Sequence, residues 1–318
     1  MNKLPILIIG FIRVEGVQRL IDSLLGEQIQ CVYLSLDGPR DANEIQEQEK
    51  IIAIVSEFSN SNALPFYLRR CSSNFGVAVG VMSALDWYFS KVSFGVILED
   101  DLVVGKGFIP FISKVKSEFE TQVDIVMISG NQFNSMAEPA KLSATHYPQI
   151  WGWATSSEKW GVLRNGLLLQ GRILLRDFIS PRNSFWAVGA RRALLGKVDT
   201  WDLPLAKFMK HNSMVCLLPP VNLVTNVGAD KFAVHTKENQ FPLFAPIENL
   251  DINKLSIEIP TSSEIGQMNK YLEKNVFRIG PLNLFSLPSG LLRMLGHPDR
   301  STLELRLMAS RIDSTETP

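Results

Sequence analysis

The chain has 318 residues, of which 46% are hydrophobic and 20% are charged, close to the average for globular proteins. This composition excludes a disordered chain, a collagen-like fibre and a disulfide-rich miniprotein. Lysine and arginine together number 32, as do aspartate and glutamate. The chain therefore lacks the basic surplus with which duplex nucleic-acid binders neutralise phosphates, and we expect no nucleic-acid partner.

Short apolar runs alternate with helical stripes through the first 130 residues. Strands are expected at residues 4–9, 31–36, 65–68, 94–98 and 123–129. Helices are expected where apolar residues recur every three or four positions, at 17–25, 44–58, 78–89 and 108–119. This alternation predicts an α/β fold with a mostly parallel central sheet flanked by helices.

The pattern becomes less regular after residue 130. Four of the six tryptophans lie between Trp151 and Trp186, among glycines and polar loops, which predicts an irregular α+β half packed on the sheet. Three prolines between residues 242 and 260 indicate a linker, and helices are expected over 264–310. The terminal DSTETP is expected to fray.

Cysteine usage and hydropathy indicate the compartment. The three cysteines, Cys31, Cys71 and Cys216, are far apart and form no CxxC pair, as is typical of a reducing environment. The first apolar run is too short for a secretory signal, and no uninterrupted apolar run reaches the roughly 18 residues that span a bilayer. The sequence predicts a cytoplasmic protein.

Three carboxylates, Glu99, Asp100 and Asp101, directly follow the predicted strand at 94–98. In α/β sheets, ligands bind outside the carboxyl ends of the strands, near the point where strand order reverses. Oxygen ligands suit Mg²⁺ or Mn²⁺, and packed like charges need a compensating cation. A solvated acidic turn that caps the next helix is the alternative, but the position at a strand end favours a metal site.

Other segments with polar residues allow two interpretations each. Asp37 lies in a turn-forming Asp-Gly-Pro and could equally accept a hydrogen bond from a nucleotide. Asn74 and Gly76 enter a helix whose N–H groups attract anions, but they match neither GxGxxG nor the P-loop. By spacing, Asp202 is favoured as a helix N-cap over a catalytic base, and a lone histidine such as His235 has no special claim.

Taken together, several segments resemble a known family. They are, in chain order, SLDG, NFG with ALDWYF, VILEDDL, WGWATSSEKWG, TWDLPLAKFM and NLVTNVG followed by HT. Over residues 4–236 this order is similar to GT-A glycosyltransferases, and most of all to the N-acetylglucosaminyltransferase I type and its bacterial surface-glycan relatives. The resemblance implies a donor half over 1–130, an acceptor half over 131–240 and a C-terminal extension over 241–318.

The resemblance also implies a reaction. A metal-dependent, inverting enzyme would move a hexosyl or N-acetylhexosaminyl group from a nucleotide-diphospho-sugar to a hydroxyl of a glycan or lipid-linked acceptor, in bacterial polysaccharide synthesis. Mn²⁺ or Mg²⁺ would be the cofactor.

The same resemblance implies roles for single residues. Asp101 would hold the metal, and Asp202 would be the general base. Trp151, Gly152 and Trp153 would shape the sugar and acceptor pocket. Donor binding would fall to Phe11, Arg13, Asp37, Asn74, Gly76, Glu99, Asp100 and His235. The stretch from Gly228 to Val234 departs from the bacterial pattern, in which acidic residues stand shortly before the His-Thr pair.

Alternatives to this enzyme stay open. A non-catalytic protein of the same fold could bind sugar nucleotides or glycans. An unrelated nicotinamide- or ATP-dependent enzyme would need glycine fingerprints that the chain lacks. Apolar residues and arginines over 277–300 could contact a membrane surface, although packing on the catalytic domain or on a second subunit is favoured.

Overall fold

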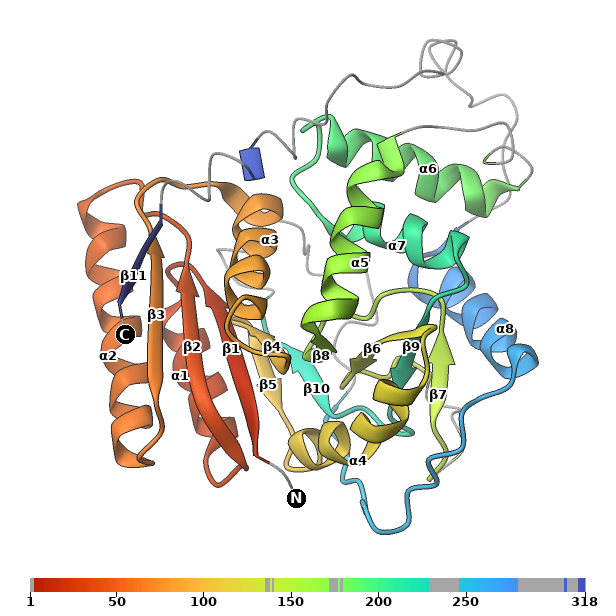
Figure 1. Ribbon diagram of the computed structural model, residues 1–318, viewed down its shortest axis with the longest axis horizontal. Helices are drawn as coiled ribbons and strands as arrows, with labels where there is room; N and C mark the ends of the chain where they lie inside the picture. Colours follow the sequence, from red (N-terminus) through yellow and green to blue (C-terminus); the bar gives the residue numbers. More distant parts are fainter. Residues whose placement is uncertain are drawn as a thin grey trace.

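The structure is a computed structural model that describes residues 3–134, 138, 140–171, 177, 180–228, 246–279, 306–307 and 314–317. Its centre is a nine-stranded sheet with the order β11-β3-β2-β1-β4-β8-β6-β9-β7 (Figure 1). These strands are β1 (Leu4–Gly10), β2 (Ile29–Leu36), β3 (Phe66–Cys71), β4 (Phe94–Glu99), β6 (Ile125–Ser129), β7 (Ser143–Thr145), β8 (Trp153–Ser156), β9 (Val215–Leu218) and β11 (Ser314–Thr317). A separate pair joins β5 (Leu102–Val104) to β10 (Val224–Asn226).

Most strands of the large sheet run in one direction. β1 is parallel to β2 and β4, and β2 is parallel to β3. β8 runs antiparallel between β4 and β6, while β9 is parallel to β6. Since β7 and β11 are antiparallel to their neighbours, only β7, β8 and β11 oppose the other six strands of this sheet. The prediction of an α/β fold with a mostly parallel sheet is confirmed.

Helices cover both faces of the sheet. They are α1 (Val14–Leu24), α2 (Ala42–Ser61), α3 (Gly76–Phe89), α4 (Phe108–Thr121), α5 (Ser157–Leu168), α6 (Pro181–Leu194), α7 (Asp202–His211) and α8 (Ser262–Tyr271). A 3₁₀ turn (Leu169–Gly171) follows α5, and a π-helical turn (Leu272–Val276) follows α8. In Figure 1, α5, α6 and α7 gather at one end of the sheet, above β8 and β9.

Successive side chains of the strands point to opposite faces of the sheet and contribute to two apolar cores. Ile6 and Ile8 of β1 pack with α1, α2 and α4, whereas Leu7 packs with α3, α5, α6 and α7 on the other face. Such burial on both faces explains why the strands read as continuous apolar runs. No helix among the described residues is both long and apolar enough to cross a bilayer.

Two expectations about local structure, and the capping alternative for the carboxylates after β4, differ from what is found. Leu25 is 51% exposed, because α1 ends at Leu24 and the chain turns at Gly26 with φ +81°. β5 separates the carboxylates after β4 from α4, whose N-cap is Gly107, so these carboxylates do not cap that helix. The C-terminal residues Ser314–Thr317 pair with β3 instead of fraying, because the edge of β3 offers unpaired backbone groups.

Candidate functional site

A cavity of about 550 Å³ opens at the carboxyl ends of β1, β2 and β4. The chain moves from β1 to β2 on one side and later returns to β4 on the other, so the cavity lies where strand order reverses. It is lined by Ile9, Gly10, Phe11, Ile12, Arg13, Ser35, Asp37, Arg40, Asn74, Gly76, Val77, Gly80, Val81, Glu99, Asp100 and Asp199. Most of the residues expected to bind a donor therefore share one cavity.

Asp37 follows β2 and joins it to the start of α3. Its Oδ1 accepts hydrogen bonds from the N–H groups of Gly38 and Phe75, at 2.9 Å each, and its Oδ2 accepts one from Gly76 at 2.9 Å. Burial raises the pKa of Asp37 above its ordinary value, while these N–H groups and the nearby Arg69 oppose the rise. Asp37 is thus a turn residue and a cavity residue at once.

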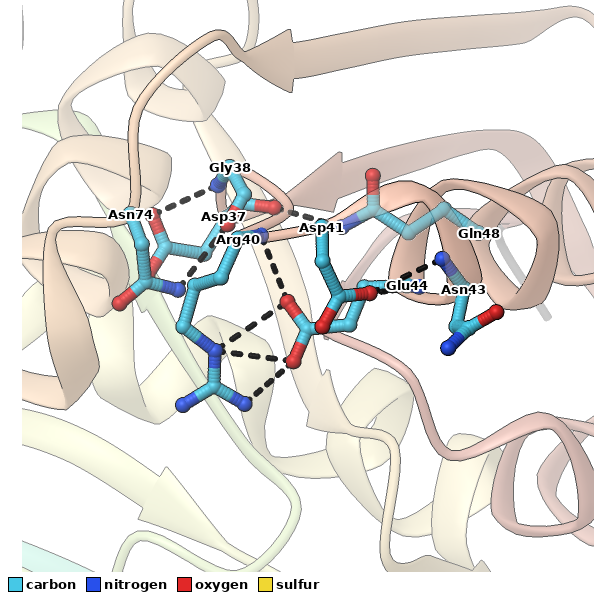
Figure 2. Close-up of polar contacts among 8 residues, drawn as sticks. All are labelled: Asp37, Gly38, Arg40, Asp41, Asn43, Glu44, Gln48 and Asn74. Carbon is cyan, nitrogen blue, oxygen red and sulfur yellow. Dashed lines mark hydrogen bonds and ion pairs between the residues drawn. The ribbon is translucent and has the colours of Figure 1, made fainter.

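The two loops beside Asp37 are held together by side chains that Figure 2 shows. Asn74 Nδ2 donates to the Gly38 carbonyl at 3.0 Å, and Gln48 Nε2 donates to the Asp37 carbonyl at 2.7 Å. A Cβ on Gly38 would overlap the Ser73 backbone, so close approach of the loops requires a glycine there. Asn74 lines the cavity as expected, but its amide N–H is used to join the loops.

Arg40 is a cavity residue that the sequence did not single out. Its guanidinium pairs with the Glu44 carboxylate, as Figure 2 shows, and lies 5.1 Å from the centre of the Phe11 ring. Glu44 also accepts a hydrogen bond from the Arg40 N–H at 2.6 Å. Asp41, between them, caps α2. The spacing of Arg40 and Glu44 resembles an ordinary helix-start pair, so nothing in the sequence marks Arg40 as part of a cavity.

Glu99, Asp100 and Asp101, called here the acidic row, meet the loop after β1. Asp100 Oδ2 accepts a hydrogen bond from the Phe11 N–H at 2.9 Å. Arg13 Nη1 lies 3.2 Å from Asp100 Oδ1 and 3.0 Å from Asp101 Oδ2, in two ion pairs. The structure therefore brings Phe11, Arg13 and the acidic row together, and the guanidinium supplies part of the compensating charge.

Burial and mutual repulsion disfavour ionisation in the acidic row. The pKa of Glu99 is raised well above its ordinary value by burial and then by the carboxylates of Asp101, Asp100 and Asp202. Burial and Asp101 raise the pKa of Asp100 to about 6, against the opposing effect of Arg13. Burial also raises the pKa of Asp101, against the opposing effects of Arg13, of the Asn226 side chain and of its own N–H. A further cation at this place would relieve the repulsion that remains.

One oxygen of the acidic row fits a metal ion. Asp101 Oδ1 is buried and has no hydrogen-bond partner, a costly state for a carboxylate oxygen unless a cation reaches it. In the described part of the chain, no three His, Cys, Asp or Glu side chains group as a metal site. Mg²⁺ typically takes only one or two carboxylates and completes its shell with water and substrate phosphates, so one Asp101 oxygen is sufficient.

Asp202 is the first residue of α7, and the N-cap interpretation of it is wrong. Trp201 holds the cap position, and no side chain caps this helix. The Thr200 hydroxyl instead donates a hydrogen bond to Asp202 Oδ1. Because the Asp202 carboxylate contributes to the raised pKa of Glu99, Asp202 lies within electrostatic range of the acidic row.

The residues expected at the acceptor pocket lie beside the core. Trp153 is 1% exposed and stacks on Trp201 with ring centroids 5.9 Å apart. Trp151 packs edge-on against Phe133 at 5.3 Å, and Gly152 has φ +59°. Of the described residues around the cavity, none is from this segment, and its acceptor role stays a prediction. His235 lies outside the described residues.

Asp199 is a second cavity residue that the sequence did not reveal. Its carboxylate accepts hydrogen bonds from the N–H groups of Val77 and Ala78, at 2.8 and 3.1 Å. The partners are more than 120 positions apart, so no local spacing could have indicated the contact.

Comparisons with known proteins give structural likenesses only. No family model matches the chain, and no curated protein matches it. Glucosyl-3-phosphoglycerate synthase from Mycobacterium tuberculosis, solved with Mn²⁺, UDP and phosphoglyceric acid, is similar with 11% identity and a TM-score of 0.30, over 54% of this chain and 58% of that one. The A197 protein from STIV is similar with 12% identity and a TM-score of 0.32, over 71% and 84%.

A third similar structure is the apo form of the bifunctional glycosyltransferase WbbM, with 9% identity and a TM-score of 0.31, over 52% of this chain and 34% of that one. The matched region thus spans about a third of WbbM and less than two thirds of the synthase. Identities and TM-scores this low carry no argument about function, so a function must be argued from the geometry of the site itself. The finer resemblance to the N-acetylglucosaminyltransferase I type stays a prediction.

Proposed function

We propose that this protein is a metal-dependent, inverting glycosyltransferase that uses a nucleotide-diphospho-sugar. The observation that carries the proposal is that Glu99 and Asp100 of the acidic row line the same cavity as Asp37, while Asp101 lies behind them on the shared guanidinium of Arg13. Asp202 lies within electrostatic range of the row. The cavity thus has a carboxylate at its nucleotide end, and beside it lie an oxygen suited to a metal on Asp101 and the proposed base Asp202.

The donor occupies the cavity between α3 and the ends of β1, β2 and β4. Its volume of about 550 Å³ falls within the roughly 300–1,000 Å³ of small-molecule sites. Asp37 accepts hydrogen bonds from the nucleotide, and the Phe11 ring, with Arg40 beside it, forms an apolar wall. Glu99 and Asp100 face the sugar and ribose.

Asp101 Oδ1, which is buried without a hydrogen bond, would hold the metal, and a cation of this kind leaves most of its ligand positions to water and substrate phosphates. When bound, Mn²⁺ or Mg²⁺ neutralises the charge that develops on the diphosphate leaving group. Arg13 keeps Asp100 and Asp101 in place by pairing with both.

Asp202 acts as the general base. The hydrogen bond from Thr200 to Oδ1 orients its carboxylate, and the other oxygen takes the proton of the acceptor hydroxyl. The acceptor oxygen attacks the anomeric carbon as the bond to the diphosphate breaks, and that bond's electron pair leaves with the diphosphate. A single displacement from the opposite face inverts the configuration, and general-base help of this kind contributes roughly 10²–10⁴-fold.

A thermal-shift screen followed by turnover assays tests the proposal. We expect one class among UDP-, GDP- and dTDP-sugars to raise Tm in the presence of Mn²⁺, because a ligand stabilises the state that binds it, while CMP-sugars, which carry a single phosphate, should not. Asp101→Ala should lose the metal-dependent part of this shift. Asp202→Asn should keep the shift and lose release of the nucleoside diphosphate; undiminished release in that variant would refute the base assignment.

The acceptor, the compartment and the pathway are further parts of the proposal that rest on the resemblance. A hexosyl or N-acetylhexosaminyl group would pass to a glycan or lipid-linked acceptor at the cytoplasmic face of a membrane. Most of the residues over 277–300 that would touch lipid lie outside the described part of the chain. Donor binding without transfer or hydrolysis would favour the non-catalytic alternative.

A further inference from the structure

A carboxylate from the second half of the chain caps the helix that walls the cavity. Asp199 Oδ2 accepts a hydrogen bond from the Val77 N–H, and Oδ1 accepts one from the Ala78 N–H. Phe75, which holds the cap position of α3, offers no side-chain cap of its own. Two of the N–H groups at the start of α3 therefore depend on Asp199, which stands three residues before Asp202 and whose Oδ1 also lies 4.0 Å from Arg306 Nη1.

Gly76 shows how closely Asp199 is fitted against α3. The residue has φ +77°, and a Cβ at this position would overlap Asp199 Oδ2. Any larger residue would push the Asp199 carboxylate away from the two N–H groups. The glycine in the NFG segment thus serves this contact as well as the turn.

Contacts along the segment 199–202 hold each of its four residues in place. Trp201 is 2% exposed and stacks on Trp153, and Thr200 bonds to Asp202. Trp153 pairs with Ile97 of β4 in the sheet, two residues before Glu99. Asp199 therefore anchors the first residue of the segment to α3. Trp201, through Trp153, holds its middle next to β4, the strand that precedes the acidic row.

We propose that Asp199 is the positioning residue of the base: its two hydrogen bonds to the start of α3 hold the segment 199–202 so that Asp202 stays within reach of the acidic row. The inference rests on the proposed function, because it assigns Asp199 an effect on the general base. Since α3 also forms a wall of the cavity, one contact fixes the place of the base relative to the donor.

The first test needs no substrate. Asp199→Asn is compared with Asp41→Asn, a matched control, because Asp41 also caps a helix through two N–H groups, those of Asn43 and Glu44 at 2.9 Å each. In hydrogen–deuterium exchange, Asp199→Asn should speed exchange at residues 77–78 and also at 200–203. Asp41→Asn keeps Oδ1, the oxygen that accepts from both of its N–H groups, so it should change exchange little at 43–45 and not at all at 200–203. Unchanged exchange at 200–203 in Asp199→Asn overturns the proposal.

The second test separates positioning from donor binding. With Mn²⁺ and the nucleotide sugar that gives the largest thermal shift, Asp199→Asn should lower kcat about a hundredfold and leave the donor KM within about twofold, while Asp41→Asn should change neither. Asp199→Asn should add nothing to Asp202→Asn, because it acts through the base. A raised KM at unchanged kcat, or additive losses in the double variant, overturns the proposal.

Two further measurements keep the outcomes apart. Asp199→Ala removes both acceptor oxygens, whereas the isosteric Asp199→Asn keeps one, so Asp199→Asn should fold even where Asp199→Ala does not, and Asp199→Ala should show the larger loss of kcat. Full turnover in Asp202→Asn would refute the proposed base, whereas a lost Asp202→Asn activity with an unaffected Asp199→Asn refutes only the positioning role.

Discussion

The carboxylates at the start of α3 and those of the acidic row are compensated in different ways. Asp37 and Asp199 accept hydrogen bonds from successive backbone N–H groups of residues 75–78. The acidic row shares the guanidinium of Arg13, and Asp101 Oδ1 is left buried without a hydrogen bond. Backbone donors are fixed, whereas a side-chain cation can be joined or replaced by an ion from solution. The comparison favours the acidic row over the start of α3 as the place of the proposed metal.

Arg13→Met should give the largest loss of stability, because it leaves the acidic row without its guanidinium. The side chains of Arg13 and Asp100 are only 16% and 10% exposed, and removing one partner of a buried ion pair costs about 3–5 kcal/mol. Mn²⁺ should restore part of this loss by binding the row. Urea unfolding with and without Mn²⁺ measures both effects.

Arg40→Met is the matched control for this change. Its side chain is 61% exposed in an ion pair with Glu44, and such pairs contribute no more than about 1 kcal/mol. The difference in unfolding free energy between Arg40→Met and the parent protein should be the same with and without Mn²⁺. Equal losses for Arg13→Met with and without Mn²⁺ would contradict the assignment of the acidic row as the cation site.

Gly38→Ala should cost about 3 kcal/mol, because the new methyl group would overlap the Ser73 backbone and force the two loops beside Asp37 apart. Nucleotide affinity should fall with it. Gly161→Ala is the control: Gly161 lies in α5 with no atom within 4 Å of an added Cβ, so alanine should stabilise by up to about 1 kcal/mol. Thermal unfolding compares the two, and a neutral Gly38→Ala would show that the loops can separate freely.

Asp37→Ala should cost about 2 kcal/mol, because the N–H groups of Phe75 and Gly76 lose their acceptor. Asp41→Ala, at the start of α2, should cost about 1 kcal/mol as an ordinary lost cap. Neither loss should respond to Mn²⁺ in urea unfolding. If Mn²⁺ restored the stability of Asp37→Ala, the proposed difference between the two groups of carboxylates would be contradicted.

The sequence was informative where parallel strands end together. Buried strands and amphipathic helices in the first half have strong periodicity, and polar residues after them must meet at one edge of the sheet. Asp37, Asn74, Glu99 and Asp100 do so. The strands β5, β7, β8, β9 and β10 were missed because three or four residues are too few for a period to show.

The residues that the sequence could not place depend on contacts between distant segments. Asp199 reaches α3 across more than 120 positions, and Asp202 was favoured as a cap because Pro204 follows it, although the Thr200 hydroxyl engages its side chain instead. The resemblance assigns Trp153 to the acceptor pocket, which stays a prediction, but its stacking on Trp201 could not be read from the sequence. Such contacts leave no local pattern.

The start of α3 also limits how phosphate groups can be recognised. In many nucleotide-binding folds the positive end of a helix macrodipole receives the phosphates. Here Asp37 and Asp199 already neutralise that end, so an incoming diphosphate must rely on cations for its attraction. Nucleotide affinity in this protein should consequently weaken steeply with ionic strength, more than in folds that use backbone amides.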